Sequence, residues 1–205
     1  HNHQFQRLIK WMPHVVKLAK AGWVPAFFNR NERFVMNNND IVRRIRFIFN
    51  IKNADMIKIF ELGGLKMTKE QYQDIMTKQE PDTPRDEKLS RHDLEVFMNG
   101  LIISQRGVKK DEDGNPIEPD YSMQRDNDIN NVVIKKLKIA MTYSNEDLLD
   151  FWTADGFTVT KGEVGAMLRR KGHPKYLVVG DQFMRKLLAG MAITFRDNAE
   201  AGKTE

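Results

Sequence analysis

The sequence predicts an all-α protein made of two tandem homologous four-helix units that are related by a pseudo-two-fold axis. Apolar residues recur at helical spacing along the 205-residue chain, and no strand-like alternation lasts beyond a few residues. The chain also aligns with itself. Residues 38–76 match 130–168 at a shift of 92 without a gap, and the matches continue near the C-terminus at a shift of 90.

The aligned stretches share caps, core positions and glycines, which chance seldom preserves together. A difference of two residues in the loop between the third and fourth helices accounts for the change of shift. The identical pairs are Asn38/Asn130, Asn39/Asn131, Asn53/Asn145, Asp55/Asp147, Gly64/Gly156, Thr68/Thr160, Lys69/Lys161 and, at the shorter shift, Gly100/Gly190.

The first 35 residues differ in character from the rest of the chain. Residues 1–35 hold six cations and one anion, so they account for the whole formal net charge of +5. Met36 is followed by Asn and Asp residues that suit a helix N-cap. We expect residues 1–35 to be translated upstream sequence or the product of a mis-set start. The alternative is a basic, aromatic segment that serves as a surface anchor or targeting signal.

Residues 36–107 form the first predicted unit. Its first helix, near 39–51, places apolar residues at positions i, i+4, i+7 and i+8, which gives one continuous stripe. The second helix, near 54–62, ends at Gly63-Gly64, because glycine can adopt the left-handed conformation that closes a helix.

The third and fourth helices of each unit follow the same rules. The third begins at a capping box, which Thr68 opens in the first unit and Thr160 repeats in the second. The fourth carries five apolar residues at helical spacing in each unit: Leu94, Phe97, Met98, Leu101 and Ile102, matched by Met184, Leu187, Leu188, Met191 and Ala192.

The remaining segments connect or end the units. Residues 108–128 are a polar linker, in which 113–116 and 118–120 predict turns and coil. The second unit spans residues 129–197. Residues 198–205 are expected to form a disordered tail.

The composition excludes several classes of protein. With 40% hydrophobic and 30% charged residues, the chain should fold. It has no cysteine, which excludes disulfides and thiolate chemistry, and no apolar run approaches the roughly 20 residues of a membrane span. No sequence motif of a hydrolase, metal site or nucleotide site is present. We therefore expect no enzyme, no cofactor or metal, and no membrane partner.

A basic triple occupies the same place in the first helix of both units. Because the duplication keeps it, two symmetric basic patches are predicted, which would bind phosphate backbone or an acidic partner. The alternative, which is the more common origin of such charges, is a solvated helix face opposite the apolar stripe. The triples are Arg43, Arg44 and Arg46 in the first unit and Lys135, Lys136 and Lys138 in the second.

The second and third helices of each unit, joined at a glycine, could form a helix-turn-helix, in which the second helix reads the major groove. The first copy is the poorer candidate, because Glu70 and Asp74 on its exposed side would repel phosphate. An ordinary helical corner explains the same pattern and is favoured. The basic residues of the second copy are Lys161, Arg169, Arg170 and Lys171.

A histidine-containing turn follows the third helix of the second unit. His173, beside an arginine pair and near Lys175 and Tyr176, could bind an anion or shuttle a proton. A loop-capping role is favoured, because no carboxylate or hydroxyl partner is predictable. Asp181 is expected at the N-cap or first turn of the last helix, and Gln182 is a candidate for a polar contact between the units.

Four segments carry a combined motif: 38–47, 97–101 with Arg106-Gly107, 130–139, and 172–176 with 180–183. Together they resemble the YehS-like family of small bacterial proteins, which are built as a tandem repeat and form a domain of unknown function. The resemblance begins at Met36 and covers essentially all of the predicted folded part. It implies a cytoplasmic, all-helical protein, and it supplies no activity, substrate or catalytic residue.

The expected function is therefore binding. The leading hypothesis is a non-enzymatic macromolecular-interaction or regulatory module, with a protein partner that the sequence does not identify. The alternative is a nucleic-acid-binding protein that uses helix-turn-helix-like corners or the paired basic helix faces. An enzyme that uses His173 is the weakest hypothesis. The oligomeric state does not follow from the sequence.

Overall fold

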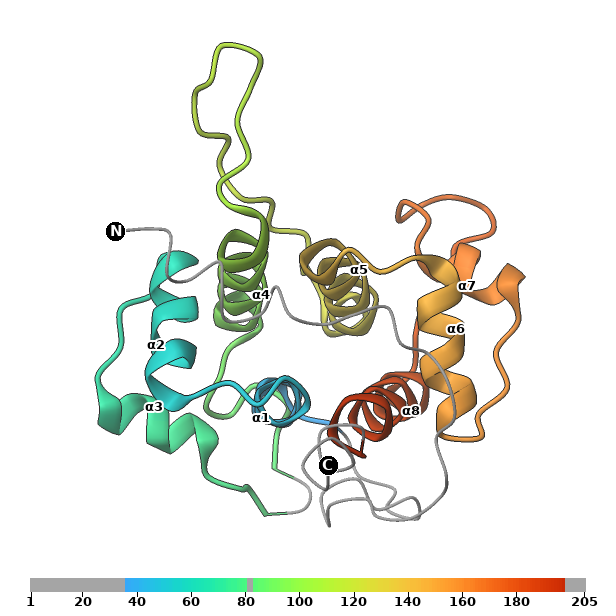
Figure 1. Ribbon diagram of the computed structural model, residues 1–205, viewed down its shortest axis with the longest axis horizontal. Helices are drawn as coiled ribbons and strands as arrows, with labels where there is room; N and C mark the ends of the chain where they lie inside the picture. The colour runs from blue at the N-terminus through green and yellow to red at the C-terminus, as the bar shows by residue number, and fades with distance from the viewer. Residues whose placement is uncertain (1–35, 81–82, 198–205) are drawn as a thin grey trace, which may run out of the picture.

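The structure, a computed structural model, describes residues 36–80 and 83–197, which form two four-helix units (Figure 1). The expectations for residues 1–35 and 198–205 lie outside the described residues. The predicted all-α class and tandem organisation are confirmed. The helices are α1 (Asn38–Ile48), α2 (Asn53–Leu62), α3 (Lys69–Met76) and α4 (Arg91–Arg106), then α5 (Ile129–Met141), α6 (Asn145–Ala154), α7 (Lys161–Met167) and α8 (Asp181–Ala192).

The helices α1, α4, α5 and α8 form the centre of the molecule, with α2 and α3 on one side and α6 and α7 on the other (Figure 1). Within each unit the second helix packs on the fourth. Between the units α4 packs on α5, and α1 packs on α8. Because α5 corresponds to α1 and α8 to α4, these are two copies of one contact, as a pseudo-two-fold axis requires. No helix in the described ranges has the length and hydrophobicity that crossing a membrane needs.

The predicted apolar stripes form the core. Ile41 and Ile45 of α1 are fully buried, as are Phe60 of α2 and its counterpart Trp152 of α6. Burying such a side chain stabilises the fold by about 1.5–3 kcal/mol. The equivalent positions of the two units therefore fill equivalent places.

One glycine in each unit allows the second and fourth helices to touch. A Cβ atom at Gly100 would lie 1.8 Å from the carbonyl oxygen of Ile59. A Cβ atom at Gly190 would lie 1.6 Å from the carbonyl oxygen of Phe151, which is the equivalent residue of α6. Neither backbone can yield cheaply, so both units require glycine here.

The duplicated asparagines tie the first helix of each unit to the end of the third and the start of the fourth. Asn39 donates to the carbonyl oxygen of Ile75 at 2.9 Å and accepts from the backbone N–H of Leu89 at 3.2 Å. Asn131 makes the same two bonds in the second unit, at 3.1 and 2.9 Å. Because these backbone groups are buried, leaving them unpaired would be costly.

Local signals fix the ends of most helices as predicted. Thr68 and Thr160 form the expected capping boxes. Gly64, just after α2, adopts the left-handed conformation, with a φ of 107°. The first helix ends at Ile48, earlier than predicted, because Asn50 adopts a left-handed φ of 51° and turns the chain.

Candidate functional site

The basic triple of α1 is divided by burial. Arg44 is only 8% exposed. The Nη1 atom of Arg43 lies 3.0 Å from the Oδ1 atom of Asp40 one turn earlier, so its charge is compensated. Arg46 donates from Nε to the Oδ1 atom of Asn53 at 2.9 Å. Arg43 is therefore held against its own helix, and Arg46 is held against the first residue of α2.

The triple of α5 is divided in the same way. Lys135 is exposed and Lys138 is half-buried, but Lys136, the counterpart of Arg44, is only 5% exposed. The expectation that all three residues of each triple form a basic patch is thereby corrected, because the middle residue is buried in both units. The physical reason is the pseudo-two-fold contact, because α1 and α5 each pack against their own unit and against the other.

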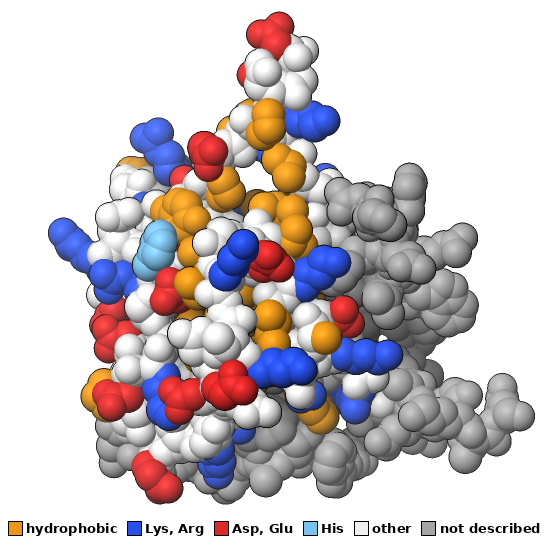
Figure 2. All heavy atoms as spheres, turned by 90° about the vertical axis from the view of Figure 1, so that its left-hand side faces the viewer, with side chains coloured by type: hydrophobic (Ala, Val, Ile, Leu, Met, Phe, Trp, Pro, Cys, Tyr) orange, Lys and Arg blue, Asp and Glu red, His pale blue; other side chains and the backbone are white. Residues whose placement is uncertain are grey.

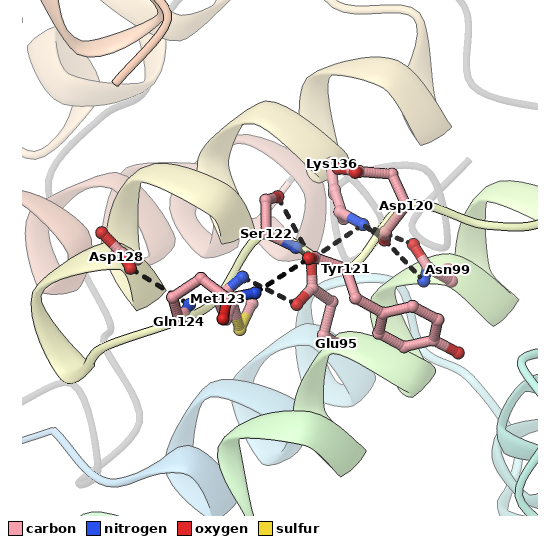
Figure 3. Close-up of polar contacts among 9 residues, drawn as sticks. All are labelled: Glu95, Asn99, Asp120, Tyr121, Ser122, Met123, Gln124, Asp128 and Lys136. Carbon is pink, nitrogen blue, oxygen red and sulfur yellow. Dashed lines mark hydrogen bonds and ion pairs between the residues drawn. The ribbon is translucent and has the colours of Figure 1, made fainter. Parts of the chain in front are cut away.

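Lys136 instead joins a buried ion pair between the units. Its Nζ atom lies 3.0 Å from the Oε1 atom of Glu95 on α4, and both side chains are almost fully buried (Figure 3). The same ammonium donates to the Oδ1 atom of Asn99 and to the backbone oxygen of Asp120, both at 2.6 Å. The three protons thus have three acceptors, which a buried lysine needs.

The partner carboxylate binds the linker. Glu95 accepts from the backbone N–H groups of Ser122 at 2.7 Å and Met123 at 2.9 Å (Figure 3). We call Glu95, Asn99 and Lys136, with the backbone of residues 120–123, the linker clamp. It fixes the returning end of the linker over the contact between α4 and α5. Sequence reasoning missed it, although Glu95 and Asn99 stand one turn apart on a helix rich in apolar residues, which was the available signal.

A second polar cluster joins the units at the start of α8, where Asp181 lies in the first turn as predicted. Its carboxylate accepts from Arg85 at 2.8 Å, from Asn130 at 2.9 Å and from the backbone N–H of Met36 at 3.2 Å. Burial raises the pKa of Asp181, but the hydrogen bond from Asn130 and the charge of Arg85 outweigh burial and hold it below its ordinary value. Asp181 therefore makes the polar contact that was expected of Gln182, which is exposed.

The basic residues expected on the third helix of the second unit lie beyond its end. The helix α7 stops at Met167, whereas the cations follow in residues 169–176, which we call the basic segment. Lys161 does lie on α7, but its Nζ atom is 2.8 Å from the Oε1 atom of Glu146. A short helix that presents one paired lysine lacks the row of side chains with which a recognition helix reads base edges.

The basic segment carries three exposed cations without a carboxylate partner. The Nζ atom of Lys171 lies 2.6 Å from the Oδ1 atom of Asp128. Arg169, Arg170 and Lys175 are exposed, and none of them forms an ion pair within the described parts of the chain. No acidic residue stands between the first turn of α7 and the start of α8. The segment is therefore a local source of uncompensated positive charge.

The histidine of the basic segment contacts its own turn. The Nδ1 atom of His173 accepts from the backbone N–H of Lys175 at 3.0 Å, and Arg169 lies 3.0 Å from Nε2. Burial and the nearby charge of Asp128 raise the pKa of Tyr176. These contacts match the loop-capping role that the sequence favours for His173. Within 36–80 and 83–197, no group of three His, Asp or Glu side chains is placed to hold a metal ion.

The linker forms an ordered hairpin that stands away from the helices (Figures 1 and 2). We call residues 108–119 the hairpin. The N–H of Asp111 donates to the oxygen of Asn115 at 2.9 Å, and the N–H of Ile117 donates to the oxygen of Lys109 at 2.8 Å. The Asp111 carboxylate accepts from two backbone N–H groups of the turn at 3.0 and 2.8 Å. The predicted turn is present, but the chain around it is ordered rather than irregular coil.

The two units correspond to two copies of one known family. The profile of a family described as "Protein of unknown function (DUF1456)" matches residues 38–107 and 130–197, once for each unit. The chain is 37% identical over 157 residues to "Uncharacterized protein YehS" of Escherichia coli (strain K12), and this alignment covers 77% of the chain and 95% of that protein. No solved structure gives a significant match. The YehS-like family and the tandem organisation are thereby confirmed.

Proposed function

The chain belongs to the DUF1456 family, and we propose that it is a non-enzymatic, cytoplasmic macromolecular-interaction module that contacts a protein partner through the hairpin. One observation carries the proposal: the hairpin is held in place and yet takes no part in the core. Its residues from 108 to 118 are all exposed. Ordering a residue costs about 1–2 kcal/mol of backbone entropy, so an ordered projection outside the core is typical of a functional loop.

Both ends of the hairpin are fixed to the helices. Gly107 closes α4, because its N–H donates to the oxygen of Ile103 at 2.8 Å and its φ of 77° lets the chain leave the helix. The linker clamp holds the returning end. Beside it, the ring of Tyr121 stacks on His92 with centroids 4.8 Å apart. A loop that is already ordered loses less entropy when it binds a partner.

Apolar side chains gather uncovered on the hairpin and at its foot. Val108 is 48% exposed, and Ile117 and Tyr121 are each 38% exposed. Within the described residues only two other large hydrophobic side chains are as open to solvent, so this concentration is not a general property of the surface. Side chains of this kind favour a protein partner over a purely electrostatic one.

A shortened hairpin tests the proposal. Replacing residues 110–116 by Gly-Gly leaves Lys109 and Ile117 joined by a two-residue turn and spares the linker clamp. Tagged full-length chains capture partners from a bacterial lysate to which untagged wild-type chain is added, beside a control that carries Lys66→Ala and Lys69→Ala on the first unit. We expect a protein that binds the wild type and the control to be absent from the shortened variant. Identical capture by all three chains would contradict the proposal.

The second candidate function is nucleic-acid binding by the basic segment, and the uncompensated charges of Arg169, Arg170 and Lys175 favour it. Labelled DNA and RNA titrated across salt would give a steep dependence of affinity on salt. Changing all three residues to alanine should reduce the slope by about 0.9 for each phosphate of duplex DNA that the variant no longer neutralises. The matched control changes three exposed lysines of the first unit to alanine: Lys52, Lys66 and Lys69. Absence of binding at low salt removes this candidate.

A further inference from the structure

The hairpin is acidic as well as exposed, and Figure 2 shows acidic side chains at its tip. Residues 108–120, which are the hairpin and the Asp120 that follows it, carry five carboxylates and two lysines, so their net charge is −3. Hydrogen bonds from Asn115 lower the pKa of Asp111, which therefore stays ionised at neutral pH. None of these charged side chains forms an ion pair within the described residues: Lys109, Lys110, Asp111, Glu112, Asp113, Glu118 and Asp120.

The basic segment offers the complementary surface. Its three uncompensated cations, Arg169, Arg170 and Lys175, match the net charge of residues 108–120 in number and oppose it in sign. Val178, two residues after the end of the segment, is 51% exposed. Both surfaces therefore combine charged residues with uncovered apolar side chains. Protein interfaces have the same composition, with apolar side chains in the core and charged side chains at the rim.

The two surfaces lie on the same edge of the molecule and apart from each other. The hairpin rises from the end of α4, and the basic segment connects α7 to α8; both point to the upper edge in Figure 1. Consider a second copy rotated by 180° about the viewing direction and placed above that edge. Its basic segment then faces the first hairpin, and its hairpin faces the first basic segment. Such an arrangement is closed and uses each contact twice, as two-fold dimers do.

We propose that two copies of this chain associate in this way, with the hairpin of each copy on the basic segment of the other. The proposal rests on the proposed function, because it identifies the partner of the hairpin as a second copy. Charge complementarity is the reason to choose this partner over a foreign protein. In this dimer each hairpin binds the basic segment of the other copy, so the basic segment contacts protein rather than nucleic acid.

Charge reversal tests the contact by sedimentation velocity of the full chain. One variant carries Glu112→Lys and Glu118→Lys on the hairpin, and the other carries Arg170→Glu and Lys175→Glu on the basic segment. Asp111 is left unchanged because its carboxylate holds the turn. We expect each variant alone to dimerise at least about tenfold more weakly than the wild type, because like charges then face each other. An equimolar mixture should dimerise again, since both contacts in the mixed dimer join opposite charges.

The control variant carries Lys66→Glu and Lys69→Glu on the first unit and should dimerise like the wild type. A wild type that stays monomeric up to about 1 mM overturns the proposal, and so does a mixture that fails to regain the dimer. If the wild type is monomeric, and it captures a lysate protein that the shortened variant does not capture, self-association alone is overturned and the proposed function stands. Unchanged capture by the shortened hairpin removes the proposed function itself.

Discussion

The two units share one backbone frame and differ in their surfaces. Asn39 and Asn131 make the same bonds, and Gly100 and Gly190 allow the same helix contact. The charges have diverged. Residues 36–107 hold twelve cations and eleven anions, whereas residues 129–197 hold eleven cations and seven anions. Equivalent positions of the two units hold the same residue where the backbone requires it. The net charge differs between the units at positions that face solvent or a partner.

The linker clamp is the clearest break in the symmetry. At the shift of 90 the counterpart of Glu95 is Arg185, and the counterpart of Asn99 is Ala189. The carboxylate and the amide of the clamp therefore have no counterparts at the contact of α1 with α8, where only Lys136 has a cationic counterpart, Arg44. Only the contact of α4 with α5 has a linker to hold. We infer that the clamp holds the linker in place, and that the packing of the two units does not require it.

The largest expected effect breaks the clamp. Lys136→Met leaves Glu95 buried without its cation, and we expect a loss of about 3–5 kcal/mol in the free energy of unfolding. The double variant Glu95→Gln with Lys136→Met removes both charges and should recover most of that loss. Urea denaturation of the wild type, the two single variants Lys136→Met and Glu95→Gln, and the double variant measures the coupling. A double variant as unstable as Lys136→Met would mean that the ion pair is not the source of the effect.

The glycine contact should respond equally in both units. Gly100→Ala and Gly190→Ala each place a Cβ atom against a backbone carbonyl, and each should cost about 3 kcal/mol. Gly165→Ala is the control, because a Cβ atom there meets nothing within 4 Å in a helix. That change should stabilise the protein by about 0.5–1 kcal/mol. Thermal unfolding separates the cases, and unequal losses at Gly100 and Gly190 would contradict the equivalence of the two frames.

The duplicated asparagines provide a milder test of the same equivalence. Asn39→Ala and Asn131→Ala each leave a buried carbonyl and a buried N–H unpaired, so each should cost about 2 kcal/mol. Hydrogen exchange should report faster exchange at the N–H groups of Leu89 and Val179 respectively. The comparison fails if one variant is destabilised and the other matches the wild type.

The smallest effect concerns pH. The pKa of Asp181 is lowered in the folded chain, so its contacts stabilise the protein above the ordinary Asp value of 3.8, and this stabilisation is lost as the pH falls below it. Asp181→Asn should cost about 1 kcal/mol at pH 7. The difference between wild type and variant should shrink as the pH falls below 3.8. A difference that stays constant from neutral pH to well below that value would exclude the role of the charge.

The sequence was enough to predict the features that depend on neighbouring residues or that recur in both units. The capping boxes at Thr68 and Thr160 depend on neighbours in the chain, and the self-alignment located the equivalent helices without any knowledge of their packing. The burial of Arg44 and Lys136 could not be foreseen, because both residues look like an exposed helix face until the second unit covers them.

The order of the hairpin and the position of Arg169 and Arg170 in a connecting segment were not foreseen, for related reasons. The turn at residues 113–116 is readable from its composition, but its order depends on Glu95, which lies far away along the chain. The end of α7 at Met167 moved Arg169 and Arg170 from a helix face to a connecting segment, and no strong stop signal marks that end.

The most direct test is the sedimentation coefficient of the hairpin-shortened variant, once urea unfolding shows that the variant is folded. It tests whether the hairpin serves binding while the helices fold without it. The predicted result is a folded monomer under conditions in which the wild type dimerises. At a concentration at which the wild type is itself monomeric, the two free energies of unfolding should agree within about 0.5 kcal/mol. A variant that still dimerises, or one that cannot fold without residues 110–116, would contradict it.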